Sequence, residues 1–367
     1  MKAKKILYIT PGLNVGGAEK FVITLSDALA AESESQLLVS LVAHNALHSE
    51  LNKSIQFITL PRKYKLDILP ILKLRKLIRK EKPDVIFCVN FFSYFFLKCA
   101  TIFLNVTTKR VISYHSTIHV SKKEYLLHQF YSFILNKNDK IITVSNNQAE
   151  YTAKQLGIPT SQFKTIHNGI DTQYWQPWSP SDSDGGYIRN KYNIPRDIKV
   201  IIKAAAFRKE KNHLGAVRAL QALHSVHRCK AYLLLLGEGP MLDEVKNLVV
   251  ELGMQDYVIF TGLQKNVRPF YLESDLFTLC SSNVETFSIA ALEAMACGLP
   301  CVLTDIGGAR EMIVEGTTGY LCTPEYQDIA NAWHKALNAD FKKEKIHEHV
   351  ATNFGAAEMI KEYEKIL

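Results

Sequence analysis

Two acidic residues in one apolar stretch have the types and spacing to do chemistry. Residues 276–305 read LFTLCSSNVETFSIAALEAMACGLPCVLTD, with Glu285 near the middle and Glu293 eight residues later. Along a helix, this spacing would separate the two residues by roughly 12 Å and about 80°. They are therefore no close acid and base pair. Because helical side chains lean toward the N-terminus, both carboxylates can still line one elongated ligand.

The elements that hold these acids follow the pattern strand, helix, strand. Residues 276–280 and 300–304 are short apolar runs, and the segment between them is rich in Ala, Leu and Met. Gly298 falls where a helix C-terminal glycine belongs, so the helix is predicted from about Thr286 to Cys297. Its candidate capping residues are Asn283 and Thr286.

The start of this helix suits a phosphate group. The N–H groups of its first turn, those of Thr286, Phe287 and Ser288, have no partner within the helix and attract anions. A nucleotide diphosphate sugar fits this arrangement, with one carboxylate on the ribose diol and the other near the sugar. A purely structural alternative pairs a buried Glu293 with a basic residue such as Arg310 and leaves Glu285 as an ordinary acid at a helix start.

The stretch ETFSIAALEAMACGLPCVLTDIGGARE resembles the signature of retaining glycosyltransferases of the GT-B fold, specifically glycosyltransferase family 4. Glu285 and Glu293 match the family's Glu-x7-Glu pair, and the match continues through residues 307–311 and 316–319. The resemblance implies an α/β protein with two doubly wound, Rossmann-like domains and a central cleft. It also implies transfer of a sugar, with retention of configuration, from a nucleotide diphosphate sugar to an acceptor hydroxyl.

The length of 367 residues suits two domains. We predict an N-terminal, acceptor-side domain at 1–170, a Pro-, Ser- and Gly-rich linker at 171–197, and a nucleotide-sugar-binding domain at 198–350. Residues 351–367 are expected to form a helix that crosses back to the first domain, as is usual in this fold. No run of 18 apolar residues occurs, so a cytoplasmic protein is expected. The seven cysteines include no C-x-x-C pair, and we expect no metal and no cofactor.

The positive charge lies in the first half of the chain. Residues 1–168 contain 23 Lys and Arg against 11 Asp and Glu, whereas the remainder has 21 against 25. Within residues 62–82, basic and leucine residues alternate, so this helix can lie on an anionic membrane or simply pack its Leu side on the sheet. Nucleic acid is disfavoured because no recognised binding motif accompanies the charge. The acceptor hypothesis that follows is a saccharide or lipid-linked saccharide at the inner face of the membrane, such as a polysaccharide or lipopolysaccharide precursor.

Two features of the first half are candidates for donor binding. Gly16 and Gly17 follow the first strand and allow close approach to a ligand. The loop is not G-x-G-x-x-G, and the second strand ends without an acid, which argues against a dinucleotide enzyme. His115 follows a strand, where a side chain points into a ligand crevice, although a lone histidine is more often structural. The resemblance implies that Gly16 and Gly17 approach the donor and that His115 orients the sugar.

A basic cluster, FRKEKN, follows the first strand of the second half and suits phosphate, although a solvated turn has the same composition. The resemblance implies an Arg and Lys clamp for the donor diphosphate, and we expect the donor to be a UDP sugar. Lys211 matches the Lys, but Ala206 occupies the commonest Arg position, so Arg208 is assigned that role. This departure leaves open an alternative, a non-catalytic sugar-nucleotide-binding protein or partner subunit on the same fold.

Overall fold

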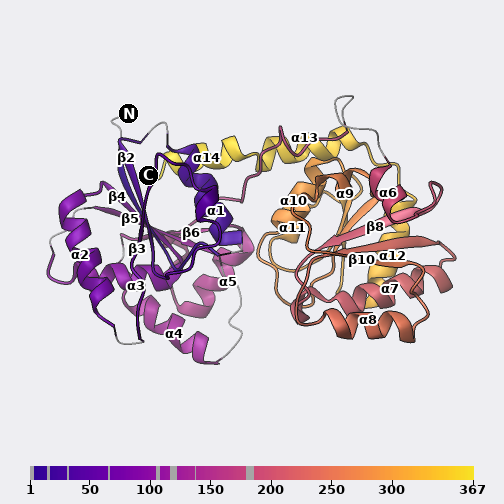
Figure 1. Ribbon diagram of the computed structural model, residues 1–367, viewed down its shortest axis with the longest axis horizontal. Coiled ribbons are helices and arrows are strands. Elements are labelled where there is room, and N and C mark those ends of the chain that lie inside the picture. The colour runs from indigo at the N-terminus through magenta and orange to yellow at the C-terminus, as the bar shows by residue number, and fades with distance from the viewer. Residues whose placement is uncertain are drawn as a thin grey trace. The chain divides into compact units, whose positions relative to one another are not determined.

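The computed structural model describes residues 4–14, 17–30, 33–64, 67–104, 108–115, 122–136, 138–178 and 186–367, with backbone only at 122–125. The chain divides into two compact units (Figure 1). The first unit contains Met1–Asn168 together with Met359–Leu367, and the second contains Gly169–Glu358. Each unit is built around its own parallel sheet.

The first unit contains a seven-stranded sheet in the order β3-β2-β1-β4-β5-β6-β7, with every pair of neighbours parallel. The chain proceeds from β1 toward one edge and from β4 toward the other, so the direction of winding changes between β1 and β4. The strands are β1 (Lys5–Thr10), β2 (Ser35–Ser40), β3 (Gln56–Thr59), β4 (Val85–Val89), β5 (Lys109–Tyr114), β6 (Lys140–Thr143) and β7 (Phe163–Thr165).

Helices cover both faces of this sheet, which explains why its central strands are buried almost throughout (Figure 1). One apolar cluster includes residues of α1, and the cluster on the other face includes residues of α2 and α3. The helices are α1 (Gly17–Ala28), α2 (Leu69–Glu81), α3 (Asn90–Thr101), α4 (Lys122–Phe133) and α5 (Asn146–Leu156), with short 3-10 turns η1 (His48–Glu50) and η2 (Thr160–Gln162).

The second unit contains a six-stranded parallel sheet in the order β10-β9-β8-β11-β12-β13. Here the winding changes direction between β8 and β11. The strands are β8 (Lys199–Ala204), β9 (Ala231–Leu236), β10 (Val258–Gly262), β11 (Leu276–Leu279), β12 (Cys301–Thr304) and β13 (Gly319–Cys322). Two doubly wound α/β sheets are what the sequence predicts.

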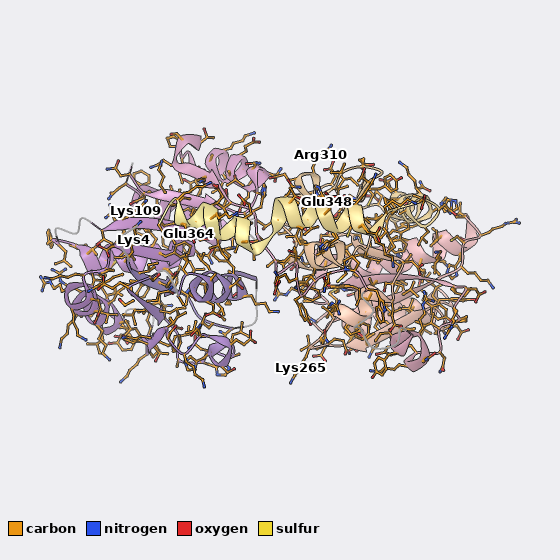
Figure 2. All side chains as sticks on the ribbon, turned by 90° about the horizontal axis from the view of Figure 1, so that it is seen from above. Lys4, Lys109, Lys265, Arg310, Glu348 and Glu364 are labelled. Carbon is orange, nitrogen blue, oxygen red and sulfur yellow. The ribbon has the colours of Figure 1, made fainter. Side chains whose placement is uncertain are left out.

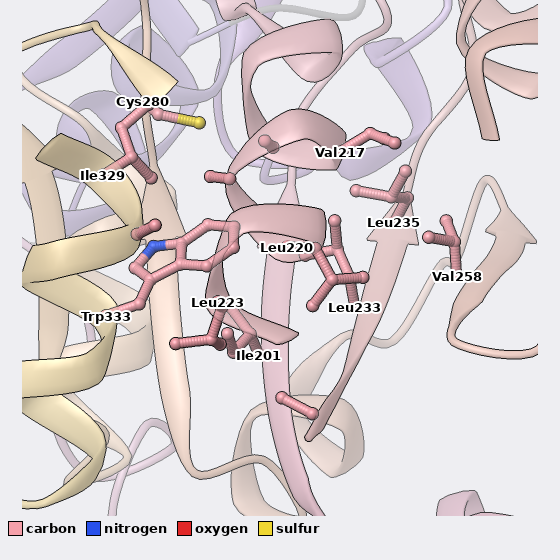
Figure 3. Close-up of a cluster of buried hydrophobic side chains, with 14 of the residues drawn as sticks. Ile201, Val217, Leu220, Leu223, Leu233, Leu235, Val258, Cys280, Ile329 and Trp333 are labelled. Atoms are coloured by element: carbon pink, nitrogen blue, oxygen red, sulfur yellow. The ribbon is translucent and has the colours of Figure 1, made fainter. Parts of the chain in front are cut away.

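The helices of the second unit alternate with these strands. They are α6 (Tyr187–Lys191), η3 (Lys209–Lys211), α7 (His213–Ser225), α8 (Leu242–Glu251), α9 (Arg268–Leu272), α10 (Ile289–Ala296), α11 (Ala309–Met312), α12 (Tyr326–Leu337) and α13 (Lys343–Phe354). Figure 3 shows the core on the α7 side of the sheet, where Leu220 and Leu233 lie among other fully buried side chains. Trp333 of α12 completes this core, and its indole Nε1 donates a hydrogen bond to Thr278 of β11 at 2.9 Å.

Part of the predicted linker is ordered structure. Residues 179–185 lie outside the described residues, but Tyr187–Lys191 forms α6. The carboxylate of Glu273 accepts hydrogen bonds from the backbone N–H groups of Ile188 and Arg189, at 3.0 and 3.1 Å. Arg189 also pairs with Asp275 at 3.0 Å. An acid at a helix start is stabilising, so these contacts explain a helix where the composition suggests only a linker.

The last helix, α14 (Ala356–Glu364), follows α13 after one residue. The side chains of Met359 and Tyr363 are buried in the core of the first unit, where the Tyr363 ring lies 5.5 Å from that of Phe21. In Figure 2, Glu364 labels this C-terminal part of the first unit, and Glu348 labels α13 in the second. The first unit is therefore assembled from both ends of the chain.

Candidate active site

The carboxyl ends of β8 and β11 lie next to each other where the second sheet changes winding direction. Ligands of open α/β sheets bind in the crevice at such a position. The segment after β8 forms η3, and the segment after β11 carries Ser281, Ser282 and Glu285. The N–H of Ser282 donates to the carbonyl of Glu210 at 2.8 Å, which fixes the two segments to each other.

An ion pair joins these segments. Lys211 Nζ donates to Glu285 Oε2 at 2.7 Å, and the hydroxyl of Ser281 donates to the same oxygen at 3.1 Å. The two paired side chains are only 24% and 16% exposed. A half-buried pair of this kind contributes little net stability, because desolvation of both charges offsets their attraction. The arrangement instead presents a cation and an anion, both held in place, at the edge where open α/β sheets generally bind their ligands.

A close backbone approach holds Glu285 in position. Gly307, in the loop after β12, has φ +57°, and a Cβ built on it would lie 1.7 Å from the carbonyl oxygen of Glu285. The N–H of Gly308 donates to the carbonyl of Thr286 at 2.8 Å. The two glycines that continue the signature beyond the helix therefore lock the backbone that carries the catalytic candidate.

The signature helix starts later than the sequence predicts. It begins at Ile289, and the capping residue is Ser288, whose hydroxyl accepts a hydrogen bond from the N–H of Ala291 at 3.2 Å. The prediction of a start at Thr286, with Asn283 or Thr286 as the cap, is wrong, because Ser288 has extended backbone angles and takes the capping position itself. The N–H groups of the first turn thus belong to Ile289 and Ala290 rather than to Thr286 and Phe287.

Phe287 packs in the core, whereas Glu293 lies near a buried tyrosine. The Phe287 ring is buried and meets the ring of Phe354 edge to face, 5.5 Å between centroids. Glu293 lies on α10 near Tyr271 of α9; burial raises the pKa of the Tyr271 hydroxyl well above 10, and the charge of Glu293 raises it further. Arg310, the partner suggested for Glu293 in the structural alternative, pairs with Asp305 instead, with 3.1 Å between Arg310 Nε and Asp305 Oδ1.

Arg208 lies at the start of η3, three residues before Lys211. It lines a cavity of about 370 Å³ next to the segment that follows β11. Other residues around this cavity are Lys209, Asn212, His213, Met241 and Ser282. Two cations of the basic cluster therefore border the same hollow, and a third, Lys211, faces Glu285.

His115 lies in the first unit, directly after β5. Its Nε2 lies 2.8 Å from the hydroxyl of Ser113, and its backbone N–H donates to the side-chain oxygen of Asn90 at 3.1 Å. Its ring also contacts Phe21, 4.7 Å between centroids. Burial lowers the pKa of His115 to about 4, so the imidazole is neutral at pH 7. A neutral ring can orient a hydroxyl group but carries no charge to offer a phosphate.

The glycine loop of the first unit is described in part. Gly17 is the first residue of α1, whereas Gly16 lies outside the described residues. Asn90 was not among the residues singled out from the sequence. It has φ +65° at the end of β4, on one side of the point where the first sheet changes winding direction. Among the described residues, no group of three or more His, Cys, Asp or Glu side chains is arranged to hold a metal ion.

Ser281 was not among the site residues predicted from the sequence either. It is the first polar residue after the apolar run 276–280, and such a position marks the carboxyl edge of a sheet, where ligands bind. It binds the same carboxylate oxygen as Lys211. Within the second unit, the structure brings Lys211 and Glu285 into contact and places Arg208 nearby in the chain. The helix α10 starts at Ile289, four residues after Glu285.

The glycine lock predicts a difference between two substitutions. Gly307→Ala should destabilise the second unit strongly, because the overlap with the Glu285 carbonyl involves backbone and cannot be relieved by side-chain rotation. Gly316→Ala is the matched control: it has φ +74° but no atom within 4 Å of the added Cβ, so only backbone strain of about 1–2 kcal/mol is expected. Thermal unfolding should show a Tm several degrees lower for Gly307→Ala than for Gly316→Ala. Equal Tm values would mean that the backbone of Gly307 does not pack closely on the carbonyl of Glu285.

Known structures share this architecture. A glycosyltransferase from Rickettsia africae has a TM-score of 0.86 at 22% identity, with 100% of this chain and 98% of that chain covered. Anabaena Alr3699/HepE, solved in complex with UDP, has a TM-score of 0.83 at 20% identity, with 98% of each chain covered. At this level of identity, the likeness shows the fold, and it confirms the GT-B architecture predicted from the sequence.

Two relatives found by sequence cover 70% and 92% of this chain. N-acetyl-alpha-D-glucosaminyl L-malate synthase of Bacillus anthracis is 32% identical over 267 residues, which are 70% of this chain and 67% of that protein. The N-acetylgalactosamine-N,N'-diacetylbacillosaminyl-diphospho-undecaprenol 4-alpha-N-acetylgalactosaminyltransferase of Campylobacter jejuni is 25% identical over 92% of this chain and 91% of its own length.

Two family descriptions match consecutive parts of the chain. "Glycosyltransferase Family 4" matches residues 15–174, and "Glycosyl transferases group 1" matches residues 186–353. The second match contains Lys211, Glu285 and Glu293. The chain therefore belongs to the group 1 glycosyltransferases of family 4, enzymes with the GT-B fold.

Proposed function

We propose that this enzyme transfers a sugar, with retention of configuration, from a nucleoside diphosphate sugar to an acceptor hydroxyl. The observation that carries the proposal is the Lys211–Glu285 pair, held next to the start of α10 at the crevice between β8 and β11. This arrangement offers positive charge to a diphosphate and a carboxylate to sugar hydroxyls. Retention of configuration rests on the resemblance to the family.

The reaction requires stabilisation of the diphosphate that leaves the sugar. Lys211, held by its ion pair with Glu285, and the exposed Arg208 supply positive charge. The first N–H groups of α10, at Ile289 and Ala290, supply the positive end of the helix dipole. Because Lys211 and the helix start are positioned before the reaction, they need little reorganisation as charge develops on the leaving group. We propose that this cationic set takes the place of a metal ion, so that none is required.

The remaining candidates position the donor. We assign Glu285 to the hydroxyl groups of the transferred sugar and Glu293 to the ribose diol. The backbone of Thr286, Phe287 and Ser288, which connects Glu285 to α10, is assigned to the same donor region. From the first unit, we propose that the neutral imidazole of His115 and the glycine loop at Gly16 and Gly17 contribute to orienting the sugar. Positioning of this kind lowers the barrier by removing the entropy cost of alignment.

The donor that we propose is a UDP sugar. Anabaena Alr3699/HepE has been solved with UDP and with UDP-glucose, which supports a uridine nucleotide. A relative from Mycolicibacterium smegmatis is named as GDP-mannose-dependent, so guanosine is the main competitor. For the acceptor, we propose a lipid-linked saccharide, in line with the diphospho-undecaprenol in the name of the Campylobacter jejuni relative.

A surface of the first unit supports an acceptor at a membrane. On α2, Leu74 and Ile78 are buried against the sheet, whereas Ile68, Leu69 and Leu72 are at least 52% exposed. The same helix exposes four cations, Lys73, Lys76, Arg79 and Lys80. Both sequence interpretations of this helix are thus compatible with the structure. No described helix is long and apolar enough to span a membrane. The exposed apolar and basic side chains of α2 are the basis on which we propose peripheral attachment.

Vesicle binding tests the membrane proposal. The protein should sediment with vesicles that contain phosphatidylglycerol at low salt and should be released at 1 M salt, because attraction between surface charges is screened. Replacing Lys73, Lys76 and Arg79 by Glu should abolish sedimentation. Replacing three exposed lysines of the second unit, Lys246, Lys265 and Lys342, is the matched control. Equal binding by wild type and the α2 variant would remove this surface from the proposal.

Nucleotide-dependent thermal unfolding tests the donor proposal. UDP, GDP and ADP are each added at about 100 times a Kd determined by titration, with and without EDTA. Ligand at that excess stabilises the folded state by about 2.7 kcal/mol, which raises Tm by several degrees. The expected result is a shift with UDP alone that EDTA does not reduce. A shift with none of the nucleotides would contradict the proposed function, and loss of the shift in EDTA would contradict metal independence.

A further inference from the structure

A lysine is completely buried behind the proposed diphosphate site. Lys203 lies near the end of β8, between Ile202 and Ala204, and its side chain is 0% exposed. Its neighbours along the strand, Val200, Ile201 and Ile202, are equally buried and apolar. Lysine is almost never fully buried unless it is paired.

The partner of Lys203 is weak. Its Nζ lies 3.5 Å from Cys280 Sγ, and no carboxylate forms an ion pair with it in the part of the chain that the structure describes. A thiol satisfies one of three donor positions and does not neutralise an ammonium group. Burial lowers the pKa of Lys203; Cys280 and Glu285 oppose this effect, whereas the charge of Lys211 adds to it. Burial of this side chain is therefore costly to the fold.

Lys203 faces polar and charged groups from three other segments of the second unit. Cys280 directly follows β11, which is the strand next to β8 at the winding change, and Figure 3 shows it at one end of the core beside Ile329. The groups that interact electrostatically with Lys203 come from three other segments: Cys280 and Glu285 after β11, Lys211 in η3, and His213 at the start of α7. Lys203 thus lies in the core near the Lys211–Glu285 pair, since Cys280, its hydrogen-bond partner, immediately precedes Ser281, which binds Glu285.

We infer that Lys203 is a positioning residue of the transferase site, whose buried positive charge strengthens diphosphate binding through the Lys211–Glu285 pair. Glu285 engages the charge of Lys211 at 2.7 Å. A cation behind this pair attracts Glu285 and repels Lys211. It therefore weakens the hold of Glu285 on Lys211 and favours a contact between Lys211 and a phosphate group of the ligand. It also adds to the positive potential at the pair, whose side chains are mostly buried, so that solvent screens the charge only in part. This inference rests on the proposed function and adds a residue to it.

The inference predicts changes of opposite sign in stability and affinity. Lys203→Met keeps the length of the side chain and removes the charge, so the Tm of the nucleotide-free protein should rise, because a poorly partnered buried charge is lost. The Kd for UDP, measured by calorimetry, should increase about tenfold or more. The donor KM should rise with little change in kcat, since the diphosphate is already charged in the bound donor.

Two further variants make the test specific. Lys199→Met, at the start of the same strand, removes an exposed lysine that pairs with Asp275, and it should leave the Kd for UDP unchanged. Lys203→Gln keeps polarity without charge and should weaken UDP binding as Lys203→Met does, even if the methionine variant folds poorly.

Three outcomes would overturn the inference. Unchanged affinity for UDP in folded Lys203→Met or Lys203→Gln would remove Lys203 from the site. A lower Tm together with weaker binding in both variants would make Lys203 a packing residue. Absence of nucleoside diphosphate binding by the wild type would overturn the proposed function as well, whereas the first two outcomes leave that function intact.

Discussion

The ion pair between Lys211 and Glu285 connects two segments that are 74 residues apart in the chain. Each segment follows a buried parallel strand, and the two strands are neighbours only because the winding of the sheet changes between them. Backbone contacts within the second unit hold these two segments in position. The backbone of Gly307 packs on the carbonyl of Glu285, and the N–H of Ser282 binds the carbonyl of Glu210. The apolar core under the sheet then fixes the strands themselves.

Charge at this site is arranged in layers. The Lys211–Glu285 pair is half-buried, Arg208 and Lys209 border the neighbouring cavity, and Lys203 is enclosed in the core beneath. The four cations outnumber the three nearby carboxylates, those of Glu210, Glu244 and Glu285, and the burial of Lys203 works against folding. An anionic ligand resolves the imbalance. Binding and stability are therefore coupled at this crevice, and nucleotide should stabilise the second unit.

The sequence predicted the architecture well because local patterns determine it. The signature region folds as the expected strand, helix and strand, at Leu276–Leu279, Ile289–Ala296 and Cys301–Thr304. The start of α10 was placed too early, because three neighbouring polar residues can all act as caps and only tertiary contacts decide among them. Ser288 is the residue that caps the helix.

Long-range features of the site were not accessible from the sequence. Glu285 and Lys211 were chosen separately from their motifs, but their direct contact depends on the strand order. Lys203 stands in the run VIIKAAA, where a single lysine normally points to solvent, and only the parallel sheet and the end of β11 show that it is enclosed. The assignments of Glu285, Glu293 and His115 to parts of the donor remain predictions about binding.

Hydrogen exchange with and without UDP tests whether the diphosphate binds at the Lys211–Glu285 pair, because it locates the bound nucleotide on the chain. We expect slower exchange for backbone amides of residues 206–213 and 282–293, which carry the cations and the start of α10, with little change at the opposite ends of the same strands. Protection confined to residues outside the second unit, or protection that survives in Lys211→Ala, would contradict the claim that the diphosphate binds at the Lys211–Glu285 pair.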